Sequence, residues 1–180
     1  HILTDWAYRI FMRFDDRLST ALRQPSGSQL DADVQWRQLV DILAQHPRHF
    51  APEDVAAGLQ RTAQLSDAVP EQVRVASLRS LYGRLRSPPL ISLMAHQPPS
   101  ICAAAIASAR LSDEEWQALI PELPSRARGY LRNRRDLGPK AADMLDLWKS
   151  ADFRLPPVVN LAEHRSAHGA AQAAALPIEA

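Results

Sequence analysis

Apolar residues recur at three- and four-residue intervals through most of the chain, and prolines or serines separate the segments in which they do so. Between residues 70 and 86 this spacing places five apolar side chains on one face of a helix: Val75, Leu78, Leu81, Tyr82 and Leu85. The same periodicity is present at 34–43, 52–66, 116–123, 127–131 and 140–150. The pattern therefore predicts an all-α chain.

Prolines mark the expected helix starts at nearly even spacing. Pro70, Pro98 and Pro124 each suit the first turn of a helix, where the missing N–H costs nothing. Even spacing is typical of stacked two-helix units, because one unit alone cannot bury its apolar face. We expect a single domain of stacked helix pairs over residues 1–154, either a HEAT-like α-solenoid or an orthogonal helical bundle.

Local signals refine this picture at two helices. Residues 101–109 are mostly alanine with two isoleucines, so neighbouring helix axes can approach closely and this helix should be central. Ser112 is followed three residues later by Glu115, the capping-box pattern. Asp31 or Asp33 is the expected cap of the helix that carries residues 34–43.

The two ends of the chain differ from the middle. An aromatic helix is expected within residues 1–24, either as an end cap of the stack or as a dimerisation element, and its exposed candidates for partner contact are Trp6, Phe11 and Phe14. Residues 155–180 begin with a proline pair and then become alanine-rich, with little apolar bulk to offset the entropy of ordering. We interpret 155–180 as a linker or an extended arm.

Composition narrows the possible compartment and partners. The formal net charge of +1 predicts no long-range attraction to nucleic acid or to acidic membranes by the chain as a whole. No apolar run approaches the ~18 residues needed to span a bilayer, and Cys102, the single cysteine, lies in an apolar helix. These features predict a cytoplasmic protein without membrane association. Because the chain begins with His1, we expect a processed protein or an excised piece of a larger one.

Motifs that carry catalysis are not apparent. There is no glycine-rich phosphate loop, no HExxH, no GxSxG and no metal-spaced cysteine set. His46 and His49 lie three apart in a loop, but a metal site would need more ligands at workable spacing. We therefore predict no catalytic residue, no metal and no cofactor in this segment.

The one concentration of charge is Arg126, Arg128, Arg132, Arg134 and Arg135. Arginines at this density can bind an acidic or phosphorylated partner, or a phosphate backbone. The alternative is a solvated face paired with nearby acids, as charge runs usually are. The residues predicted to contact a partner are Arg128, Arg132 and Arg135, and a protein partner is favoured over nucleic acid.

Two stretches suggest a family. Residues 111–116 (LSDEEW) and 131–137 (LRNRRDL) resemble bacterial sensor histidine kinases in which a helical, HEAT-like N-terminal region precedes a PAS domain and the kinase core. The resemblance covers about residues 70–150. It implies a cytoplasmic, non-catalytic sensory or interaction module that regulates the downstream PAS and kinase domains of the same chain, with a possible homodimer.

The chain departs from the kinase pattern in its chemistry. The phosphoacceptor box has an acidic residue after its histidine, whereas His164 is followed by Arg165. By this resemblance, ATP, Mg²⁺ and transferase activity belong only to a kinase core outside the chain, and the parent protein is a protein-histidine kinase. The alternative function is a nucleic-acid-binding helical protein that uses the Arg126–Arg135 face.

Overall fold

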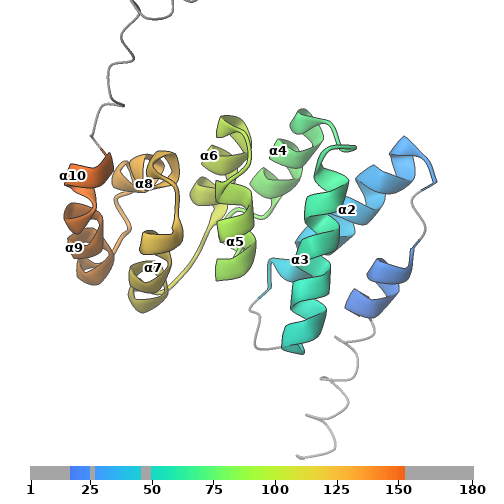
Figure 1. Cartoon of the computed structure of the whole chain (residues 1–180), viewed down its shortest axis with the longest axis horizontal. Helices are drawn as coiled ribbons and strands as arrows, with labels where there is room; N and C mark the ends of the chain where they lie inside the picture. Colours follow the sequence, from blue (N-terminus) through green and yellow to red (C-terminus); the bar gives the residue numbers. More distant parts are fainter. Residues whose placement is uncertain (1–16, 25–26, 46–49, 153–180) are drawn as a thin grey trace, which may run out of the picture.

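The computed structural model describes residues 17–24, 27–45 and 50–152, and these are helical almost throughout (Figure 1). Residues 17–23 form a first helical segment. It is followed by α2 (Gln29–Leu43), α3 (Pro52–Ser66), α4 (Glu71–Ser80), α5 (Pro88–Ala95), α6 (Pro99–Ser108), α7 (Asp113–Leu119), η2 (Ile120–Glu122), α8 (Ser125–Arg132), α9 (Pro139–Leu147) and α10 (Lys149–Asp152). Extended pairing in this part of the chain is limited to one isolated bridge between Leu85 and Ala109. The prediction of an all-α domain is confirmed.

The helices form two rows that follow the sequence along the long axis of the molecule (Figure 1). In one row α2 contacts α4, α4 contacts α6 and α6 contacts α8; in the other α3, α5, α7 and α9 follow one another in the same way. Contacts of α2 with α3 and of α5 with α6 join the rows. The chain is therefore a single stack of helix pairs.

The helix predicted to be central is α6, and it packs against α4, α5 and α8. Ile101, Cys102 and Ala105 are fully buried, and Ile106 is 1% exposed. The small side chains let three neighbouring helices approach, which is the physical reason for the alanine-rich composition.

Most helices begin where local chemistry predicted. Ser112 and Glu115 form the expected capping box of α7. The cap of α2 was predicted wrongly: Ser28 is the N-cap and Asp31 is the residue at the third helical position that bonds back to it. The hydroxyl of a serine at the N-cap reaches the free N–H groups, and the acid completes the same box.

The predicted helix over 70–86 ends earlier than expected, because α4 stops at Ser80. Gly83 adopts φ = +72°, a left-handed conformation that glycine accepts without strain. Its N–H bonds to the carbonyl of Ser108 on α6, a tertiary contact that periodicity does not reveal. Tyr82, predicted to face the core, is therefore 77% exposed, while Leu85, which forms the isolated bridge with Ala109, is fully buried.

The last predicted helix, 140–150, is two helices, α9 and α10, that meet at Trp148. The aromatic residues Trp6, Phe11 and Phe14 and the predicted linker 155–180 lie outside the described residues. Within the described part of the chain, no helix combines the length and apolar character needed to cross a membrane.

Candidate functional site

The predicted arginine face is largely an internal network. Arg128 lies on α8 with its side chain only 8% exposed, and it faces the carboxylate of Asp152, whose side chain is 4% exposed. Arg128 Nε donates to both carboxylate oxygens of Asp152, at 2.8 and 3.0 Å, and Nη2 donates to one of them at 2.5 Å. Arg132 Nη2 donates to the second oxygen at 2.6 Å. One buried carboxylate is therefore shared by two guanidinium groups.

Arg128 also contacts two backbone carbonyls and an aromatic ring. Its Nη1 donates to the carbonyls of Ile120 and Leu123. The guanidinium carbon lies 4.4 Å from the ring centroid of Trp148, a cation–π distance. We call Arg128, Arg132, Trp148 and Asp152 the C-terminal latch, because they join α8 to the last described helix.

The latch holds α10 through charge rather than apolar packing. The first three residues of α10 are exposed, and only the side chain of Asp152 is buried. Burial of Asp152 opposes its ionisation, but hydrogen bonds and charges from Arg128 and Arg132 outweigh this, so that its pKa lies below the ordinary value of 3.8. Asp152 is consequently an anion at neutral pH.

A third arginine of the cluster, Arg134, also makes internal contacts. Arg134 pairs with Asp136 at 2.7 Å and donates to the carbonyls of Ala109, at 3.1 Å, and Ile106. Its guanidinium lies 5.6 Å from the ring centroid of Trp116. The hydrogen bond from Arg134 lowers the pKa of Asp136 despite partial burial. Arg134 therefore fastens the loop after α8 to α6.

Of the three arginines predicted to contact a partner, Arg128 and Arg132 have side chains that are 8% and 21% exposed. Arg128 and Arg132 are turned toward Asp152, whereas the side chain of Arg135 is exposed. Arg126, which also belongs to the arginine cluster, is exposed as well.

The alternative prediction was a solvated face paired with Glu114, Glu115, Glu122 and Asp136. Arg134 does pair with Asp136, but its side chain is 14% exposed, and Glu114 pairs with Lys140 at 2.7 Å. The sequence did not predict the contact between Arg128 and Asp152, because the two residues lie 24 positions apart along the chain.

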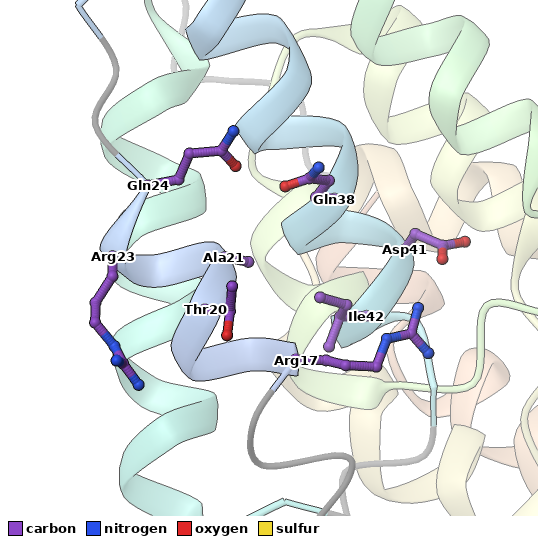
Figure 2. A pocket seen from close by; sticks show the side chains of 8 residues that line it. All are labelled: Arg17, Thr20, Ala21, Arg23, Gln24, Gln38, Asp41 and Ile42. Carbon is purple, nitrogen blue, oxygen red and sulfur yellow. The ribbon is translucent and has the colours of Figure 1, made fainter.

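A groove of about 620 Å³ lies elsewhere, between residues 17–24 and α2 (Figure 2). We call it the α2 groove. The lining consists of Arg17, Thr20, Ala21, Arg23, Gln24, Gln38, Asp41 and Ile42. Figure 2 shows the amides of Gln24 and Gln38 on opposite walls, with Arg17 extending across toward α2 and Arg23 pointing away from it.

The walls of the α2 groove are fixed by buried contacts. Gln35, fully buried, donates to the carbonyls of Ala21 at 2.8 Å and Gln24 at 2.9 Å. Its own carbonyl oxygen accepts from Arg61 at 2.9 Å. Leu18 is fully buried beside Gly58, where a Cβ would lie 3.3 Å from the leucine side chain. Nothing in the sequence pattern singled out this groove, because its two walls meet only in the folded chain.

The surroundings of Cys102 and His96 are those of structural residues. Cys102 is buried, and burial raises the pKa of its thiol. His96 Nδ1 lies 2.9 Å from the carbonyl of Ser92 at the end of α5. Among the described residues there is no cluster of three or more metal-ligating side chains.

Comparisons with protein-family models, curated proteins and solved structures find no match to the chain.

Proposed function

We propose that this chain is a non-catalytic interaction module that acts as the input segment of a cytoplasmic sensor histidine kinase. The observation that carries the proposal is the C-terminal latch, which locks α10 to α8 at the point where the chain leaves the described stack. The sequence resemblance supplies the kinase context. ATP and Mg²⁺ belong in this proposal to the kinase core, and no residue of the stack is assigned to catalysis.

The mechanism follows from the two-row architecture. Each helix contacts its predecessor and successor in its own row, so binding on one unit can alter the packing of the next. Because α10 depends on Asp152 rather than on a buried apolar face, a shift of α8 would be passed directly to α10. A ligand that prefers one arrangement then changes its population, and with it the geometry of the following segment.

The arginines favour a protein partner over nucleic acid. Arg128, Arg132 and Arg134 already contact carboxylates, which leaves Arg126 and Arg135 as the exposed members of the predicted cluster. Two separated guanidiniums form a small electrostatic footprint for a phosphate backbone, since affinity there grows with the number of phosphates neutralised.

The test uses the parent protein, identified by reading the coding sequence that continues beyond Ala180 in the source genome. A PAS and kinase core there would support the proposal, and any other continuation would refute the kinase context. Autophosphorylation is then measured for the whole kinase, for a variant without residues 1–152 and for Asp152→Ala. We expect both changes to alter the rate, with Asp146→Ala, an exposed acid on α9, as the matched control. An unchanged rate in both would refute a regulatory role.

A further inference from the structure

The α2 groove has the properties of a peptide-binding surface. Its volume of about 620 Å³ falls within the roughly 300–1,000 Å³ that is typical of ligand clefts. Ala21 and Ile42, 5% and 6% exposed, provide an apolar floor. The buried Gln35 contacts described above fix one wall to the other, so the groove is formed without a partner.

The amides on its walls suit a polypeptide backbone. Gln24 and Gln38 face the groove from opposite sides (Figure 2), and neither side chain makes a hydrogen bond within the described residues. Each side-chain amide offers donors and an acceptor. A pair of such groups on opposite sides of a groove can bond the N–H and C=O groups of an extended chain.

The charges around the groove favour an acidic occupant. Arg17 extends across it and makes no ion pair with a described residue. Arg23 also lines the groove but points away from it, and its guanidinium donates to the carbonyl and the hydroxyl of Ser19. Asp41 is the single acid in the lining, and it lies 3.9 Å from Arg84 on the far side. The uncompensated charge within the groove is therefore positive, in contrast to the latch, where each guanidinium already contacts a carboxylate.

A second, smaller groove of about 170 Å³ continues this surface across α2. It lies between α2 and α4, and Asp41 lines both grooves. Arg37, Val40 and Leu81 add one further cation and two apolar side chains. Arg37 likewise makes no ion pair among the described residues, so the positive character extends over the helix.

We propose that the α2 groove binds an extended acidic segment of a partner protein, with Gln24 and Gln38 contacting its backbone and Arg17 contacting a glutamate or aspartate. The lining contains no aromatic ring on which a base could stack, which favours a peptide over a single-stranded nucleic acid. The inference deepens the proposed function by naming the partner chemistry of an interaction module.

The experiment measures fluorescence anisotropy of labelled decapeptides with the full chain at low salt. One peptide alternates glutamate with alanine, and matched peptides carry glutamine or lysine in place of glutamate. We expect the glutamate peptide to bind about tenfold or more tightly than the glutamine peptide, with affinity falling as salt rises. Arg17→Glu should weaken it by a similar factor, while Lys149→Glu, which reverses the charge of an exposed lysine on α10 that lines neither groove, should change it less than twofold.

Gln38→Ala tests the amide contact separately, and circular dichroism of each variant shows that the fold persists. Equal binding of the three peptides, or equal loss in Arg17→Glu and Lys149→Glu, would overturn the proposal. A polyuridine oligonucleotide that binds more tightly than the glutamate peptide and loses its affinity in Arg17→Glu would also overturn it.

The occupant is identified by photo-crosslinking from p-benzoylphenylalanine introduced at position 38. Crosslinks to the glutamate peptide support the proposal. Crosslinks to residues 1–16 of the same chain, or to a second copy, that persist when peptide is added would replace it with that occupant. Failure here leaves the kinase measurements untouched: an altered autophosphorylation rate without peptide binding would place the regulatory contact on another surface.

Discussion

Replacing Asp152 with alanine should destabilise the C-terminal end of the stack more than replacing any exposed acid among the described residues. The carboxylate accepts three hydrogen bonds from Arg128 and one from Arg132, and its loss leaves the 8%-exposed Arg128 side chain without a counter-ion. Removing one partner of a buried ion pair typically costs about 3–5 kcal/mol.

Two features of the structure make the expected loss of stability smaller than this value. Arg128 keeps the carbonyls of Ile120 and Leu123 and the ring of Trp148, and α10 can detach because its other three residues are exposed. Detachment would let water reach the guanidinium, which limits the penalty. We expect about 2–4 kcal/mol of lost stability for the alanine variant, and a smaller loss for Asp152→Asn, which keeps one acceptor oxygen.

The assay is urea unfolding followed by circular dichroism at pH 7, with Asp146→Ala as the control. That exposed acid makes no ion pair among the described residues, so its replacement should cost less than about 0.5 kcal/mol. Amide hydrogen exchange of residues 149–152 gives a local measure. Their protection should fall in Asp152→Ala before that of α6 does.

The pH dependence gives a second measurement of the same group. Since folding lowers the pKa of Asp152 below 3.8, its contribution is fully present above the unfolded pKa and is lost as pH falls through the folded one. The stability difference between the native chain and Asp152→Asn should be constant above about pH 5 and should shrink below about pH 4. A difference that does not change in acid, or an alanine variant as stable as Asp146→Ala, would refute the latch.

Three further substitutions test the stack. Ile106→Asp should abolish the cooperative thermal transition followed by circular dichroism, because it places an unpaired charge where the native side chain is 1% exposed; a folded variant would contradict the position of α6. Ser112→Ala removes the reciprocal hydrogen bonds with Glu115 and should lower the free energy of unfolding in urea by about 1 kcal/mol. An unchanged free energy of unfolding would contradict a stable capping box. Gly138→Ala would place a Cβ 2.3 Å from the Asp113 carboxylate, which accepts from the first N–H groups of α9, and should lower stability by about 1–2 kcal/mol; an unchanged urea midpoint would show that this contact can shift freely.

Much of the helical architecture could be predicted because its signals are local. Proline at the first turn and the Ser112–Glu115 box act within a few residues, and both stand at helix starts in the folded chain. Apolar spacing at three and four residues likewise identified the buried face of α7, which carries Trp116 and Leu119, since periodicity determines which side chains share a face. The boundaries that failed depended on distant contacts, as at Gly83, whose N–H bonds to Ser108.

The contacts of the candidate site, by contrast, could not be predicted from local signals. The sequence by itself determined that the arginines near the C-terminal end of the stack are clustered, and that alanine-rich helices pack closely. Only the tertiary structure decided that Arg128 and Arg132 converge on Asp152, and that Gln24 and Gln38 face one another across a groove. The physical reason is range: helix formation depends on neighbours within about one turn, whereas the partner of a charge is set by how whole helices pack.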